Sequence, residues 1–283
     1  MVDKSLSRGL ADHVLDELKG LTERYAAECR RILSGIPHKR HGVQSMLNRL
    51  TVVGERCLLT QVVGGHPRWR WASTCAFITE VESAPGSERN RSINFRAART
   101  YVHINRVPQG GLEGAVVLTV QEHAVERLFL RLNVLDAAAV REEMHDAMCL
   151  AVPVLSACAA LGLKQIALPT RSGAFLCSID GEHQSLIAKT WIPKSNEPGR
   201  HTAVVGAIDA YYTRAGGEQA VGMELISIPY DMPLTSHSAA DDFVAALAPF
   251  SWLKDPYSPR RDPVGAAWRG ARSHAHALEE VGR

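Results

Sequence analysis

The chain has 283 residues, of which 46% are hydrophobic and 22% are charged. This composition is typical of a globular protein with a sizeable core and argues against a disordered or fibrous chain. The formal net charge of +2 excludes a globally basic protein, so any surface that binds nucleic acid has to be local.

The six cysteines are scattered and form no CxxC pair, which indicates reduced thiols and no zinc site. The first twenty residues lack the apolar stretch of a signal peptide, and no uninterrupted apolar run reaches 18 residues. No carboxylate cluster has the spacing of metal ligands. We therefore expect a cytoplasmic protein with no membrane partner, no metal and no cofactor; the pattern does not indicate an oligomeric state.

The N-terminal part of the chain predicts a helix followed by strands. Residues 10–36 repeat apolar side chains at helical spacing, which predicts an N-terminal helical segment within residues 1–50. Residues 51–63 and 71–81 are rich in β-branched and aromatic residues. We therefore expect residues 51–114 to be a β-rich region.

A loop with alternating arginine and tryptophan, GGHPRWRW, connects those two expected strands. Cations that alternate with aromatic rings can hold phosphates and stack on bases. Arg68, Trp69, Arg70 and Trp71 are therefore candidate nucleic-acid-binding residues. The alternative is a turn whose tryptophans enter the core while the arginines stay in solvent.

The stretch TVQEHAVERLFLRLN, residues 119–133, predicts a helix, with Thr119 as N-cap and Glu122 completing a capping box. His123, Arg127 and Arg131 recur every four residues, and at about 100° per residue they fall within an arc of roughly 80°. Apolar residues occupy the opposite side. One face can therefore pack into a core while the other presents an imidazole and two guanidinium groups, an arrangement that suits a phosphate.

A second helix and a β-meander are expected next. Asp136 is an N-cap candidate for a helix over residues 137–161, which Gly162 would close and Pro153 should kink or split. Strands are predicted over residues 165–168, 174–179 and 184–192, with a hairpin signal at Asp180-Gly181. The result is a central helix–helix–three-strand module over residues 115–193.

The third of these strands carries Thr190. Strict alternation places Leu186, Ala188, Thr190 and Ile192 on one face, and Lys189, a further candidate for nucleic-acid binding, on the other. If the preceding helix packs on the Thr190 face, Thr190 approaches the His-Arg row. Histidine beside arginines suits RNA cleavage, because an imidazole moves protons near neutral pH and guanidinium groups hold the phosphate.

The stretch HAVERLFLR, followed by a helix, a DG hairpin and a strand ending in AKTWI, resembles small toxin-type ribonucleases of the barnase–EndoU–colicin–RelE superfold. In one branch of those, a helix begins His-Ala-x-x-Arg-x-x-x-Arg and a late strand carries a threonine. The positions here that match are His123, Ala124, Arg127, Arg131 and Thr190. The resemblance covers about residues 115–193. It implies metal-independent RNA cleavage, with His123 as acid or base, the arginines as phosphate clamps and Thr190 as a supporting hydrogen bonder.

The C-terminal part is expected to be an α/β extension over residues 203–250, with a strand at 221–228 and a helix at 239–247. A loose tail is expected over residues 254–283.

The expected fold class of the whole chain is α+β, with one or more antiparallel sheets and helices packed on them. The expected function is a ribonuclease-like or toxin-like effector, with RNA and a protein inhibitor or other protein partner as expected partners. One alternative is a non-catalytic module that binds nucleic acid or protein with the basic row, GHPRWRW and PHKRH. Another is that the row is a solvated helix face whose Glu126 and Arg127 form ordinary surface pairs.

Overall fold

A computed structural model describes residues 1–33, 45, 48–49, 52, 63–65, 71–83, 90–103, 110–180, 185–194, 201–215 and 241–254. The fold is α+β, as the sequence predicts. The elements in chain order are α1 (Lys4–Leu33), β1 (Val63–Gly65), β2 (Trp71–Ser83), β3 (Arg91–His103), β4 (Gly110–Gln121), α3 (Glu122–Leu132), α4 (Ala137–Leu161), β5 (Gln165–Pro169), β6 (Gly173–Asp180), β7 (Ser185–Pro193), α5 (Thr202–Ala215), α7 (Asp241–Leu247) and the 3-10 helix η2 (Ser251–Lys254).

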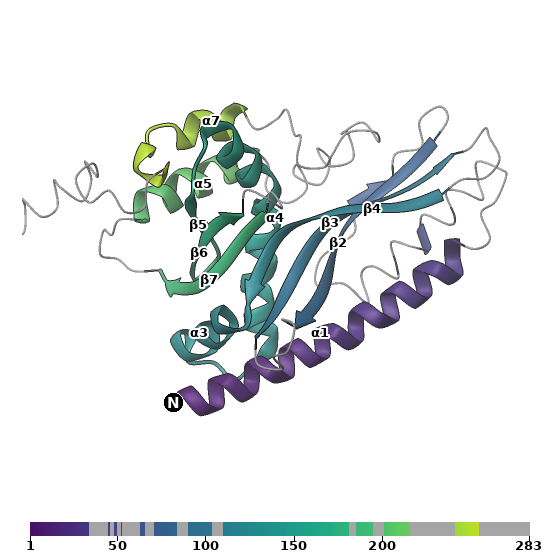
Figure 1. The fold of residues 1–283 in the computed structure, drawn as a ribbon, viewed down its shortest axis with the longest axis horizontal. Helices are drawn as coiled ribbons and strands as arrows, with labels where there is room; N and C mark the ends of the chain where they lie inside the picture. The colour runs from purple at the N-terminus through teal and green to yellow at the C-terminus, as the bar shows by residue number, and fades with distance from the viewer. Residues whose placement is uncertain are drawn as a thin grey trace, which may run out of the picture.

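The described strands form one sheet in the order β1-β2-β3-β4-β7-β6-β5. Two antiparallel meanders, β1 to β4 and β5 to β7, meet where β4 runs parallel to β7 over residues 118–120 and 186–188. The sequence left open whether the β-rich region and the central module share a sheet, and their strands do. In Figure 1, α1 runs beneath the long strands β2 to β4, while α5 and α7 lie at the other end near β5.

One face of the sheet, the core face, is fully apolar where β3, β4 and β7 meet. Cross-strand partners there are buried together. These residues are Ile93, Phe95, Leu118, Val120, Leu186 and Ala188. Helix α4 belongs to the same hydrophobic core through its buried side chains. Each large apolar side chain that this packing buries contributes about 1.5–3 kcal/mol, so the core face fixes how α3, α4 and the sheet sit together.

Helix α4 begins and ends as predicted. Asp136 accepts a hydrogen bond from the Ala138 amide at 2.8 Å, and Gly162 adopts the left-handed conformation with φ 65°. Pro153 lies inside an uninterrupted helix, so the expected split of the helix is wrong, while the other expectation, a kink at Pro153, stays a prediction. By length and composition α4 could also cross a membrane, but 72% of its most apolar window is buried in this fold, and packing against the sheet accounts for that composition.

Polar contacts hold the N-terminal residues and the first half of helix α1 against the end of α3 and the start of β3. The Val2 amide donates to Asn133 Oδ1 at 2.8 Å, and Arg91 forms ion pairs with Asp12 and Asp16.

Residues 203–214, whose pattern was ambiguous between strand and helix, belong to α5, and the expected C-terminal helix is α7. The expected strand at 221–228, most of the strand at 51–63 and the tail from residue 255 lie outside the described residues.

Candidate active site

The helix that carries the His-Arg row begins later than the sequence predicts. Residues 119–121 continue β4, where the Thr119 hydroxyl donates to Asn94 Oδ1 on the neighbouring strand at 2.8 Å. The N-cap of α3 is Gln121, which makes no side-chain capping bond. Glu122 instead accepts from the Arg91 amide at 3.2 Å. The capping-box prediction is therefore wrong, because strand pairing takes the residues that would have formed it.

His123 is held by hydrogen bonds on both ring nitrogens. Its Nδ1 lies 3.3 Å from Glu126 Oε2, and its Nε2 lies 3.2 Å from Arg127 Nε, which can only donate. Nε2 therefore acts as an acceptor and Nδ1 as the donor to Glu126. The other carboxylate oxygen of Glu126 accepts from Arg8 of α1 at 3.1 Å. The side chain of His123 is 54% exposed while that of Glu126 is 18% exposed. The imidazole is therefore accessible to solvent, and the carboxylate to which it is hydrogen-bonded is partly buried.

Arg131 anchors the other end of the row to the sheet. Strand β4 pairs with β7 only as far as Ala188, so among the described strands none pairs with β7 beyond that residue on this side. Helix α3 follows β4 directly, and Arg131 Nη1 donates to the carbonyl oxygen of Trp191. Burial and the nearby charge of Arg127 both lower the pKa of Arg131. The row thus ends at the residue next to Thr190.

Thr190 lies on a different face from the one predicted. The pairing of β6 with β7 shifts so that Cys177 is opposite Ala188 and Leu176 is opposite Thr190, which leaves Lys189 as a bulge. The bulge reverses the alternation. Trp191 joins Ala188 on the core face, whereas Thr190 shares the second face with Ile187 and is half-buried.

The predicted common face of Leu186, Ala188, Thr190 and Ile192 is therefore wrong. Among the residues that the structure describes, no hydrogen bond joins Thr190 to His123, Arg127 or Arg131, although its neighbour Trp191 receives Arg131. Lys189 is exposed, as a solvent-facing cation would be. Arg68, Trp69 and Arg70 lie outside the described residues, and only the backbone of Trp71, the first residue of β2, is described.

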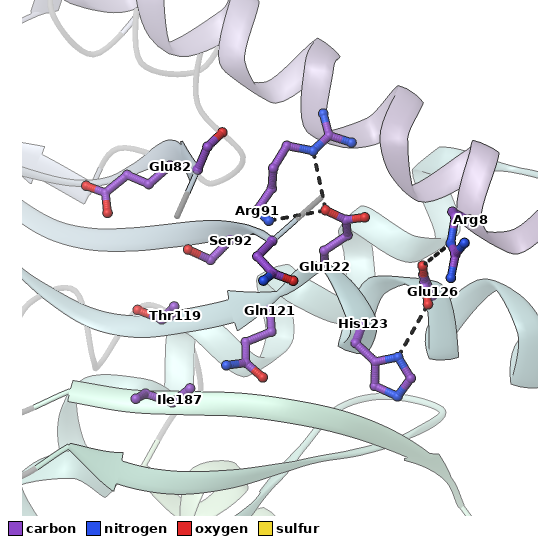
Figure 2. Close-up of a pocket in the computed structure, with 12 residues that line it drawn as sticks. Arg8, Glu82, Arg91, Ser92, Thr119, Gln121, Glu122, His123, Glu126 and Ile187 are labelled. Carbon is purple, nitrogen blue, oxygen red and sulfur yellow. Dashed lines mark hydrogen bonds and ion pairs between the residues drawn. The ribbon is translucent and has the colours of Figure 1, made fainter. Parts of the chain in front are cut away.

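A hollow of about 700 Å³ opens beside His123 (Figure 2). It lies where the ends of β2, β3 and β4 meet α3 and the start of α1. Its lining residues are Arg8, Glu82, Ser83, Asn90, Arg91, Ser92, Thr119, Gln121, Glu122, His123, Glu126 and Ile187. Figure 2 shows Gln121 near its centre, His123 to the right of it, and Ile187 on β7 at the lower left. A space of this size beside an accessible imidazole is large enough for a small organic ligand.

Arg91 organises the wall of this hollow. Its amide and Nε both donate to Glu122, at 3.2 and 3.4 Å, and its terminal nitrogens reach Asp12 and Asp16 of α1. Burial lowers the pKa of Arg91, but the nearby carboxylates of Asp12, Glu122 and Asp16 outweigh it and raise that pKa overall. Arg91 therefore stays cationic and ties strand β3, helix α3 and helix α1 together.

Sequence reasoning missed Arg8, Arg91 and Glu126 as members of the site. Glu126 carries a local signal, because it follows His123 by three residues on a helix and so lies on the same side. Arg8 and Arg91 carry none, since they reach the site from elements 118 and 31 residues away from the groups that they bind. Within the described ranges, no three His, Cys, Asp or Glu side chains group as metal ligands do.

Comparison with protein-family models, with curated proteins and with solved structures finds no match. The geometry around His123 is therefore the feature of this chain that points to a function.

Proposed function

We propose that the protein is a metal-independent endoribonuclease, a toxin-like effector whose row of His123, Arg127 and Arg131 binds and cleaves RNA at the phosphate. The observation that carries the proposal is the chain of hydrogen bonds from Glu126 through His123 to Arg127 at the edge of the hollow. These hydrogen bonds fix the tautomer of His123 that carries its proton on Nδ1, and they place the basic Nε2 beside the guanidinium group of Arg127. The imidazole stays accessible to solvent.

In the proposed reaction, Nε2 of His123 removes the proton from a ribose 2′-hydroxyl. The 2′-oxygen then attacks the adjacent phosphorus, the bond from phosphorus to the 5′-oxygen breaks, and the leaving oxygen takes a proton from water. The products are a 2′,3′-cyclic phosphate and a 5′-hydroxyl. Glu126 stabilises the imidazolium that forms, because its carboxylate accepts from Nδ1 in both protonation states.

The two arginines would hold the phosphate. Arg127 now donates to Nε2 of His123, and a bound phosphate would draw the guanidinium group to itself and release the nitrogen that acts as base. Arg131 has five N–H donors, of which one binds the Trp191 carbonyl. Guanidinium groups at this position would stabilise the charge that develops on the phosphate in the transition state.

The second candidate function is a non-catalytic module that binds nucleic acid or protein with the same row. One observation favours it: Nε2 of His123 is occupied by Arg127 and Arg131 binds backbone, so both arginines already have intramolecular partners. In this case Arg127 and exposed Lys189 would contribute charge, and the imidazole would be dispensable.

Incubating the purified protein with total RNA in EDTA separates the two functions. The enzyme function requires cleavage that survives EDTA and is lost in both His123→Ala and Arg127→Ala. The binding module requires no cleavage, with RNA retention unchanged in His123→Ala and weakened in Arg127→Ala and Lys189→Ala. Thr190→Val, which keeps the shape of the side chain, tests separately whether the threonine hydroxyl supports the reaction.

A further inference from the structure

The end of the hollow that lies on the sheet is lined by three polar side chains in a line. Glu82 on β2 pairs with Ser92 on β3, which pairs with Gln121 on β4. Directly opposed residues have Cβ atoms about 4.5–5.5 Å apart, so a carboxylate, a hydroxyl and an amide lie side by side. Among the described residues, none of these three side chains has a hydrogen-bond partner. They are therefore available to a ligand that enters the hollow.

The charges of the hollow differ between its two ends. At the helix end, Glu122 is paired with Arg91, and Glu126 is paired with Arg8 and His123. At the sheet end, Glu82 has no cationic partner within the described part of the chain. The cations of the row extend from His123 along α3 to Arg131. If the row holds an RNA phosphate, Glu82 would repel that phosphate, and the base of the same nucleotide would then face the sheet end of the hollow.

We infer, on the basis of the ribonuclease function proposed above, that the line of Glu82, Ser92 and Gln121 binds a nucleobase and favours bases with an exocyclic amino group over uracil. A carboxylate can only accept hydrogen bonds, and the cytosine amino group is a partner that aspartate and glutamate select. Uracil places a carbonyl oxygen at that position, which a carboxylate repels. Ser92 and Gln121 can donate or accept, and half-buried Ile187 offers an apolar surface to one face of the base.

Cytidine and uridine 3′-monophosphates test this inference, because the two differ only at the base and neither can be cleaved. Titration of the full-length protein, followed by NMR or calorimetry, should show cytidine monophosphate binding about tenfold tighter, the low end of the discrimination that a good polar pair gives. Glu82→Gln, whose amide can also donate, should reduce the ratio to near one. Glu142→Gln, an exposed carboxylate on α4 that pairs with Arg171, is the charge-matched control and should leave the ratio unchanged.

Equal affinities, tighter uridine binding, no binding of either nucleotide, or an unchanged ratio in Glu82→Gln would each overturn the inference. The result is independent of catalysis, because His123→Ala should keep the preference for cytidine. A cytidine preference in a protein that does not cleave RNA would leave the base site standing and remove the ribonuclease function. Cleavage without any preference would do the reverse.

Discussion

Arg131 donates a hydrogen bond to the carbonyl oxygen of Trp191, the residue that follows Thr190 in β7. The contact satisfies a backbone group at the point where β7 continues beyond its partner β4. It also fixes the end of the His-Arg row against the sheet. One arginine of the row therefore has a structural task that the other lacks, and the two can be separated by mutation.

Replacing Arg131 by alanine should lower both stability and RNA cleavage. The Trp191 carbonyl loses its donor, and leaving a partly buried polar group unpaired costs about 1–3 kcal/mol. Arg127→Ala removes only a contact with an exposed imidazole and should change the free energy of unfolding by less than about 0.5 kcal/mol. Urea denaturation beside a cleavage assay measures both effects. A loss of stability as large in Arg127→Ala as in Arg131→Ala would contradict this assignment.

Glu126→Gln should lower kcat far more than it changes KM. The neutral amide no longer stabilises the imidazolium, and a decrease of roughly tenfold to a hundredfold is part of the 10²–10⁴ that general acid–base catalysis supplies. Steady-state kinetics on a fluorogenic RNA gives both constants. Glu23→Gln, an exposed glutamate on α1, is the control and should match the wild type. An effect confined to KM would show that Glu126 positions substrate and not the imidazole.

Gly173→Ala should destabilise the fold beside the site. A Cβ atom at this position would collide with the Ile192 carbonyl oxygen and the Trp191 ring, and overpacking costs about 1–3 kcal/mol. Gly206→Ala is the matched control, because a Cβ atom there meets nothing within 4 Å and alanine stabilises a helix interior by about 1 kcal/mol. Thermal melts of the two variants should therefore shift in opposite directions, and a raised Tm for Gly173→Ala would be inconsistent with the packing described.

Asp146 should make stability depend on pH in the acid range. Burial raises the pKa of Asp146, but hydrogen bonds from His145 and Arg171 outweigh this and lower that pKa from 3.8 to about 2. A folded-state pKa below the unfolded value stabilises the protein above about pH 4, and that contribution is lost as the pH falls towards 2. The expected contribution is about 1–2 kcal/mol.

The comparison of Asp146→Asn with the wild type measures this term. The difference in free energy of unfolding should be full at pH 6 and much smaller at pH 2, where about half of the wild-type carboxyl groups are protonated. Glu142→Gln removes the more exposed carboxylate that pairs with the same Arg171 and should give a smaller difference. A penalty for Asp146→Asn that stays constant between pH 6 and pH 2 would contradict the lowered pKa.

The sequence predicts those parts of the fold whose causes are local. The N-cap at Asp136, the glycine that closes α4 and the antiparallel meander of β5 to β7 are confirmed. The start of α3 could not be predicted from residues 119–122 alone. Whether Thr119 caps a helix or extends a strand depends on its pairing with Asn94 and Ile187, far away in the chain.

The candidate site was only partly predictable for a similar reason. The spacing of His123, Arg127 and Arg131 places them on one helix face. The bulge at Lys189, which moves Thr190 to the second face, arises from the pairing of β6 with β7 and leaves no mark in the alternation of apolar residues. The partners Arg8 and Arg91 come from α1 and β3, so only the folded chain brings them to the hollow.

The role of His123 is tested by incubating a short RNA in EDTA with the wild-type protein or with His123→Ala. The same RNA with a 2′-deoxyribose at the cleaved position is incubated in parallel. His123 acting on the 2′-hydroxyl predicts that the wild type leaves a 2′,3′-cyclic phosphate and a 5′-hydroxyl. It also predicts that the deoxy substrate stays intact and that His123→Ala loses at least about a hundredfold in rate. Cleavage of the deoxy substrate, 5′-phosphate products, or full activity in His123→Ala would contradict the claim.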